Sequence, residues 1–154
     1  MDERIVSSVA DADKVIIGIG EDWNGQGERA KAGYEALSKL IEGKDYYVVS
    51  LCDDGVIDGC GFDESRLVTP NDENDDKWEA YNAWLARTLN HKLCLLELGV
   101  GLKYPGVIRW PFEKVVYVNQ KSIMYRVHKS LYQGTAETGE RCVGIKADAL
   151  EYVL

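Results

Sequence analysis

The sequence predicts an α/β domain with a mostly parallel sheet. Two observations carry this prediction: short apolar segments rich in β-branched residues, and amphipathic segments of helical period that separate them. An apolar segment without alternation suits a strand that is buried on both faces, as in parallel sheets. Strands that alternate with helices through right-handed crossovers place helices on both faces of such a sheet, which gives a three-layer, Rossmann-like arrangement.

Six segments are expected to form strands. The segment 14–19, KVIIGI, is β-branched and ends at glycines, and the segment 92–98, KLCLLEL, is the most convincing buried strand. A third, short segment stops at Pro70. The expected strands are residues 14–19, 45–51, 66–69, 92–98, 114–118 and a last one near 141–145.

Apolar residues at helical spacing predict the helices between these strands. Tyr34 and Leu37 lie on one face of such a pattern, and Gly43 follows it, as expected just past a helix end. Trp78 and Trp84 lie on one face of another. The expected helices are residues 28–42, 75–90, a short one around 104–112 and a terminal one at 147–153, and the rest of the C-terminal region is mixed.

Composition restricts the class of protein. The chain has 154 residues, of which 45% are hydrophobic and 29% charged, so a single domain over residues 1–154 is expected. Its net charge of −8 argues against nucleic acid or an anionic membrane as a partner. No segment approaches the roughly 18 apolar residues of a membrane span, and the N-terminus lacks a secretory pattern, so a cytoplasmic protein is expected. The four cysteines form no C-x-x-C pair, which favours free thiols and argues against a zinc ribbon.

In parallel α/β sheets the ligand site lies beyond the carboxyl ends of the strands. Here those ends are residues 18–24, 50–55, 69–71, 99–104 and Asn119. Neither His91 nor His128 falls at a predicted carboxyl end.

The first strand end carries Gly18 and Gly20, which would let the backbone approach a ligand closely. The third glycine of a G-x-G-x-x-G motif is replaced by Trp23, and Glu21 and Asp22 bring negative charge to this position. A tight turn without a ligand is the alternative interpretation.

The later strand ends carry carboxylates. Asp53 and Asp54 are suited to a ribose diol, a metal or a cationic substrate, or else to capping the next helix. Cys52 is interpreted as a small buried hydrophobe rather than a nucleophile. Glu97 lies inside an apolar strand, where a carboxylate is costly unless paired, and bracing of the Gly99–Gly101 loop is favoured over a contact with a ligand hydroxyl.

Taken in order, these strand ends resemble those of the sirtuins, the NAD-dependent protein deacylases. The sequence GIGED at 18–22 stands where sirtuins have G-A-G-x-S. The sequence SLCDDGVIDGCG at 50–61 resembles their T-Q-N-x-D-G-L-H-x-x-A-G, with Asp54, Gly55 and Gly61 in register.

The second half of the chain extends this resemblance. Gly99-Val100-Gly101 followed by Pro105 resembles the sirtuin G-T-S loop and its proline, and Val118-Asn119 resembles the Ile-Asn pair that contacts the adenosine ribose. The sequence LELGVGLKYPGVIRWPFE at 96–113 is most similar to a bacterial branch of sirtuin-like proteins.

The departures from the sirtuin pattern affect the chemistry. Asn71 stands at the position of the catalytic histidine, and an amide cannot act as a general base near pH 7. Leu51-Cys52 replaces the Gln-Asn pair that handles the nicotinamide ribose, and the zinc ribbon is absent. The resemblance therefore implies a sirtuin-like (DHS-like NAD/FAD-binding) fold without zinc and with impaired deacylase chemistry.

The expected function is binding of a small nucleotide, NAD or ADP-ribose, by a pseudoenzyme. The alternatives are an active NAD-consuming enzyme (a deacylase, an ADP-ribosyltransferase or an NAD glycohydrolase), in which Asp54 or Asp22 stabilises the ribose as nicotinamide leaves, and an interaction protein or homodimer that uses the helix at 75–90. A core role for Trp78 and Trp84 is favoured over that partner face. Asp54 and Asn71 are the catalytic candidates, and the nucleotide-binding candidates are Gly18, Gly20, Asp22, Asp54, Gly99, Val100, Gly101 and Asn119.

Overall fold

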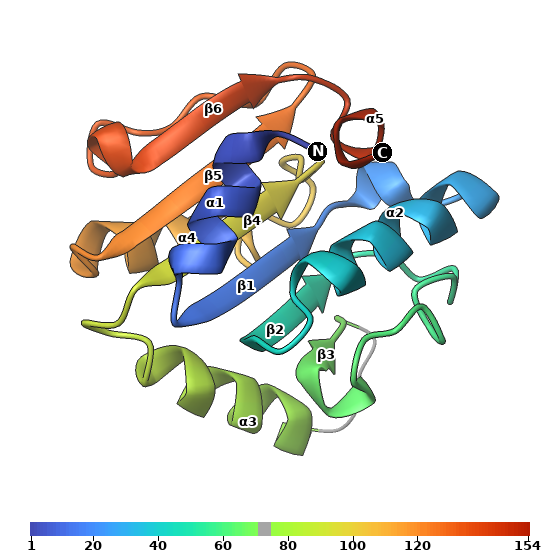
Figure 1. The fold of residues 1–154 in the computed structure, drawn as a ribbon, viewed down its shortest axis with the longest axis horizontal. Coiled ribbons are helices and arrows are strands. Elements are labelled where there is room, and N and C mark those ends of the chain that lie inside the picture. Colours follow the sequence, from blue (N-terminus) through green and yellow to red (C-terminus); the bar gives the residue numbers. More distant parts are fainter. Residues whose placement is uncertain (71–74) are drawn as a thin grey trace.

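The computed structural model describes residues 1–70 and 75–154, and these residues form a six-stranded, all-parallel sheet with the order β3-β2-β1-β4-β5-β6 (Figure 1). The strands are β1 (Lys14–Ile19), β2 (Asp45–Ser50), β3 (Leu67–Val68), β4 (Leu93–Leu98), β5 (Ser122–His128) and β6 (Cys142–Lys146). The helices are α1 (Glu3–Asp11), α2 (Glu28–Leu40), α3 (Asp75–Ala86), α4 (Arg109–Val118) and α5 (Ala149–Val153), with short 3₁₀ turns η1 (Glu21–Trp23), η2 (Glu64–Arg66) and η3 (Gly139–Arg141).

The helices cover both faces of the sheet, so the expected three-layer, Rossmann-like α/β fold is confirmed. Helices α1, α2 and α5 pack on one face, and α3 and α4 pack on the other (Figure 1). The central strand β1 shows why its sequence is uniformly apolar: Val15 and Ile17 face the first layer, whereas Ile16 faces the second. None of the described helices is both long enough and apolar enough to cross a bilayer.

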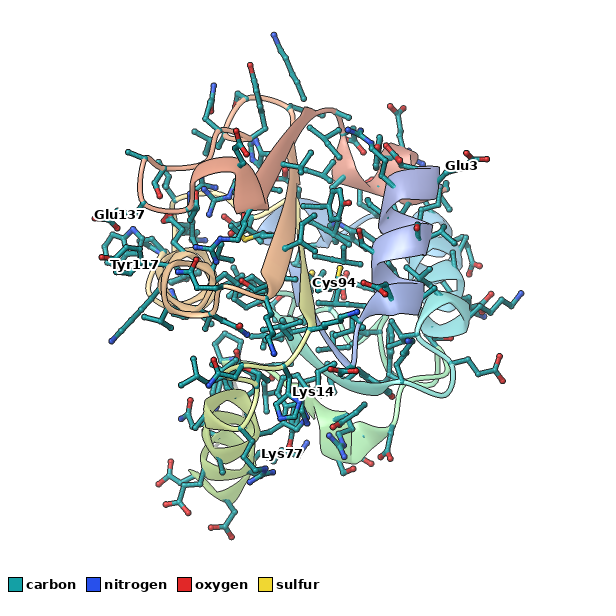
Figure 2. All side chains as sticks on the ribbon, turned by 60° about the vertical axis from the view of Figure 1, so that its left-hand side comes forward. Glu3, Lys14, Lys77, Cys94, Tyr117 and Glu137 are labelled. Carbon is teal, nitrogen blue, oxygen red and sulfur yellow. The ribbon has the colours of Figure 1, made fainter. Side chains whose placement is uncertain are left out.

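Residues 114–118 lie in α4, so the strand expected there is wrong. Phe112 and Val116, four residues apart, are fully buried, whereas Tyr117 is exposed and points outward (Figure 2). That spacing is helical, and packing of one helix face overrides the β propensity of the KVVYV segment. Pro111 is compatible with the helix because it lies in the first turn.

The pattern does not predict β5 or α1. β5 has the sequence SIMYRVH and contains Arg126, which interrupts its apolar residues yet is only 1% exposed. A buried arginine needs a counter-charge from elsewhere in the fold, and the local sequence does not reveal one. The helix expected around 104–112 instead runs from Arg109 to Val118, and the other expected strands and helices are present with ends that shift by a few residues.

The chain adds β2 and β3 on one side of β1 and its later strands on the other, so the order in which strands are added reverses between β1 and β4. β2 and β3 lie on one side of β1, and β4, β5 and β6 lie on the other. The loops that follow β1 and β4 meet at this point: a Cβ atom placed on Gly20 would lie 1.8 Å from the carbonyl oxygen of Gly99. Gly18 is equally confined, because a Cβ there would lie 2.6 Å from Ile108 on the α4 side. Both glycines therefore have a packing role.

We expect Gly20→Ala to reduce the free energy of unfolding by about 1–3 kcal/mol, because its methyl group forces two backbone loops apart. The matched control is Gly106→Ala, since no atom lies within 4 Å of the Cβ it adds. Urea unfolding of both variants measures the difference. Equal stability of the two variants would contradict the loop contact.

Candidate functional site

Four loops gather at the carboxyl edge of the sheet, after β1, β2, β4 and β5. They bring together Gly20, Asp22, Asp54 and the Gly99–Gly101 segment, all of which the sequence analysis selected. Asn71 lies outside the described residues.

Hydrogen bonds join the loops that follow β1 and β2. The Gly25 amide donates to Asp54 Oδ2 (3.0 Å), and the Asp53 amide donates to Asn24 Oδ1 (3.1 Å). The Val56 amide donates to Asp54 Oδ1 (3.2 Å), so each oxygen of Asp54 accepts a backbone N–H. These contacts favour the structural interpretation of Asp54, in which it organises backbone rather than acting on a substrate.

Asp22 is the more available carboxylate. Its side chain is 51% exposed, and its Oδ2 lies 3.5 Å from Nε2 of His128, whose side chain is 11% exposed. The sequence analysis missed His128 because it did not recognise β5, of which this residue is the carboxyl end. The signal that could have identified it is the segment Ile123 to Val127, which is apolar except for Arg126 and is followed by the histidine.

The imidazole of His128 is held on its other side by backbone. Nδ1 accepts hydrogen bonds from the amides of Ser130 (3.0 Å) and Leu131 (2.9 Å). A ring nitrogen that accepts two N–H donors carries no proton, so the neutral ring has its proton on Nε2. The protonated nitrogen is therefore the one that faces Asp22.

Glu97 lies beneath this edge in a cluster of buried charges. Arg126 donates to Glu97 through Nε (2.5 Å to Oε2) and a terminal nitrogen (3.0 Å to Oε1), and both side chains are 1% exposed. Arg109 lies 3.7 Å from the same carboxylate, and Glu113 lies 3.6 Å from Arg126. Burial raises the pKa of the Glu97 carboxyl, and the positive charges of the two arginines oppose that shift. The pair of hydrogen bonds that Glu97 accepts from Arg126 is typical of an ionised carboxylate.

The arginines of this cluster extend to the neighbouring loops. Arg109 donates to the carbonyl oxygens of Val100 (3.1 Å) and Leu131 (2.9 Å), and Arg126 donates to that of Gln133 (2.9 Å). Glu97 therefore braces the glycine loop, as the favoured interpretation expected, and it also braces the segment after β5.

The glycine loop is packed against η1. Gly99 has a positive φ of 69°, and a Cβ there would lie 3.2 Å from the Cβ of Asp22. A Cβ on Gly101 would lie 2.7 Å from Oε1 of Glu21. Within the described residues, Glu21 Oε2 and the Trp23 indole N–H are buried without a hydrogen-bond partner. Among the buried side chains that the structure describes, the Tyr34 and Tyr81 hydroxyls likewise have no hydrogen-bond partner.

Asn119 does not join the other candidates. The expectation that it follows a strand is wrong, because it follows α4 and lies at the amino-terminal edge of the sheet, next to the start of β4. Its buried amide donates to the carbonyl oxygens of Thr88 (3.0 Å) and His91 (3.2 Å). Val100 is also directed into the core and is 1% exposed.

A hollow of about 300 Å³ opens at the ends of β2 and β3. Cys52 lies at its wall, where burial raises the pKa of the thiol, and its Sγ donates to the carbonyl oxygen of Gly20 (3.4 Å). The thiol therefore stays protonated, which agrees with a buried structural role. A larger hollow of about 500 Å³ lies at the amino edge, which is not the edge where ligands of this fold bind. The smaller hollow, at the ends of β2 and β3, is lined by Cys52, Asp53, Gly55, Ile57, Asp58, Glu64, Leu67, Thr69 and Lys77.

Two further expectations concern metal and partners. Within residues 1–70 and 75–154, no group of three or more His, Cys, Asp or Glu side chains is arranged to hold a metal ion, and the absence of zinc stays a prediction. Trp84 is 3% exposed, and Trp78 packs partly buried against the same cluster, so both tryptophans belong to the core, as favoured.

We expect Glu97→Gln to reduce the free energy of unfolding by about 3–5 kcal/mol, because it leaves buried Arg126 without its nearest counter-charge. Glu113→Gln is the control: that side chain is 16% exposed and its removal leaves Glu97 in place, so its cost is smaller. Urea unfolding measures both. A loss below about 1 kcal/mol for Glu97→Gln would show that the cluster does not hold this edge together.

Comparison with known proteins shows partial similarity to proteins of ADP-ribose chemistry. No family model matches the chain. A probable bifunctional ADP-ribose hydrolase/ADP-ribosyltransferase of Fusarium oxysporum f. sp. cubense is 47% identical over 49 residues, which are 30% of this chain and 8% of that protein. A protein ADP-ribosyltransferase of Staphylococcus aureus is 27% identical over 70 residues, which are 46% of this chain and 22% of that protein.

The chain thus spans less than a quarter of the length of either relative. Neither relative is named as a sirtuin, so the resemblance to sirtuins stays a prediction. What the comparisons establish is that parts of this chain are similar to two proteins whose names refer to ADP-ribose.

Proposed function

We propose that this domain binds the ADP-ribose part of NAD, or ADP-ribose itself, at the carboxyl edge of its sheet. The observation that carries the proposal is the reversal of the chain between β1 and β4, because ligands of open α/β sheets bind outside the carboxyl ends of the strands at such a point. The two partial relatives, both named for ADP-ribose chemistry, support this choice of ligand.

The charges along the edge favour one orientation of the nucleotide. The loops after β4 and β5 carry Lys103 and Lys129, and Lys129 also pairs with Asp148 at 3.3 Å; their positive charges suit a diphosphate. The other end of the edge is acidic and suits ribose hydroxyls and the positively charged nicotinamide ring of NAD. Its carboxylates are Glu21, Asp22, Asp53, Asp54, Asp58 and Glu64.

The glycines also constrain where the nucleotide lies. Gly20 and Gly99 touch, so the ligand would rest on this contact rather than pass between the loops. Gly101 is partly exposed beside Glu21, and its loop is the natural neighbour of the diphosphate.

Binding is tested by calorimetry with ADP-ribose and NAD on the parent and on Gly101→Val. We expect the parent to bind with a dissociation constant below about 1 mM, and Gly101→Val to lose at least about tenfold in affinity, or 1.4 kcal/mol. Its melting temperature should change little, since a Cβ at Gly101 meets only the end of the Glu21 side chain.

Gly106→Val is the matched control, because the space around Gly106 is open. Equal loss of affinity in both variants, or no binding by the parent at millimolar ADP-ribose, would refute the proposed site. A large drop in the melting temperature of Gly101→Val alone would mean that its loop is needed for the fold.

A second candidate function, transfer of ADP-ribose from NAD, is favoured by the half-exposed carboxylate of Asp22. In this reaction the bond between the ribose C1′ and the nicotinamide nitrogen breaks, and nicotinamide leaves with the electron pair. A bond forms between C1′ and an acceptor nucleophile, whose proton passes to a base. Asp22 would stabilise the positive charge that develops on the ribose and receive that proton.

Release of nicotinamide from NAD, with and without a protein acceptor, tests this candidate. We expect Asp22→Asn to slow release by about 10²–10⁴-fold, the range of general acid–base catalysis. Asp11→Asn removes the same charge from a 73% exposed side chain at the opposite edge and should keep the parent rate. Equal rates for the parent and Asp22→Asn would exclude Asp22 as the base. Removal of acyl groups from lysine is expected to be absent or very slow, on the sequence assignment of Asn71.

A further inference from the structure

We infer that His128 is a positioning residue for Asp22: its Nε2, which lies 3.5 Å from that carboxylate, donates to it when substrate is bound and so holds it for reaction at the ribose. This inference rests on the second candidate function, transfer of ADP-ribose from NAD, and it names a residue that neither the sequence pattern nor the comparisons indicate. It is carried by the hydrogen bonds of His128, its burial and its place in the sheet.

Two backbone amides fix the tautomer of the neutral His128 ring. The amides of Ser130 and Leu131 converge on Nδ1 at 3.0 and 2.9 Å, so this nitrogen is an acceptor. A proton on Nδ1 would face two N–H donors at close range. The neutral ring therefore presents an N–H at Nε2 only, and that atom lies 3.5 Å from Asp22 Oδ2.

The support of the His128 ring is rigid. His128 ends β5, pairs with Lys146 of β6 in the sheet register, and accepts the Ala147 amide on its own carbonyl (3.2 Å). The Leu131 carbonyl, next to the amide that Nδ1 accepts, in turn accepts a hydrogen bond from buried Arg109. The ring is thus held at its backbone and at one nitrogen, and its remaining polar atom has a defined direction.

Asp22 needs a hydrogen-bond donor to hold its carboxylate in one orientation. Its carboxylate is half exposed, belongs to a short 3₁₀ turn, and stands next to Glu21. Without a donor it would sample several rotamers, and a misplacement of about 1 Å can cost on the order of a hundredfold in rate. The distance of 3.5 Å is long for a hydrogen bond, and contacts of this kind often tighten only when the substrate is bound.

Two substitutions separate this role from a merely structural one. In His128→Asn the side-chain oxygen can take the place of Nδ1 and accept the two amides, but no donor reaches Asp22. In His128→Gln the side-chain amide can take the place of Nε2 and donate to Asp22, but the acceptor for Ser130 and Leu131 is lost.

We expect His128→Asn to keep the melting temperature of the parent. Its kcat for nicotinamide release should fall at least tenfold, while its KM for NAD stays within about twofold. We expect His128→Gln to melt at a lower temperature than the parent but to keep kcat within about threefold of the parent value. A purely structural histidine gives the same melting temperatures but the reverse pattern in kcat, with His128→Asn as active as the parent and His128→Gln impaired, and that result would overturn the inference.

A measurement without substrate tests the contact itself. Nitrogen-15 NMR of the parent should show His128 protonated at Nε2, with a slowly exchanging Nε2–H signal that is lost in Asp22→Ala, which removes the acceptor. Protonation at Nδ1, or an Nε2–H signal that Asp22→Ala leaves unchanged, would overturn the inference. If the parent neither binds nor cleaves NAD, the proposed function fails, and the NMR result alone then decides whether His128 holds Asp22.

Discussion

The buried carboxylate of Glu97 determines how half of the carboxyl edge is arranged. It lies at the end of β4, where desolvation of a single charge would be prohibitive, and Arg126 and Arg109 make it tolerable. Each arginine then uses its remaining N–H groups on a carbonyl of a neighbouring loop. The geometry of this half follows because any other loop position leaves a buried guanidinium donor without an acceptor.

The other half of the edge is organised without buried charge. Asp54 and Asn24 accept backbone amides across the gap between the loops after β1 and β2, and both side chains lie near solvent. The two halves meet where Gly20 touches Gly99, and Asp22 and His128 face each other across this boundary. The candidate site therefore combines one half fixed by ion pairs with another fixed by neutral backbone donors.

The sequence was sufficient for the fold class because the nearly unbroken apolar segments 14–19 and 92–98, typical of strands buried on both faces, alternate with segments of helical period. It misled at 114–118, where β-branched residues are spaced for a helix, and this error carried Asn119 to the wrong edge. Local patterns placed Gly20 and Asp22 just after a strand end, where the structure has them. They could not identify His128, because its strand contains an arginine whose counter-charge lies 29 residues away in sequence.

The hydrogen bonds between the loops after β1 and β2 affect the entropy cost of ligand binding at this edge. Loops already tied to each other lose little conformational entropy when a ligand arrives, so contact energy is not offset by ordering of the chain. Association then follows from diffusion and orientation, and differences in affinity between ligands appear mainly as differences in residence time. A surface of this kind discriminates by the shape and charge it already presents, because it has little freedom to adapt to a poorer fit.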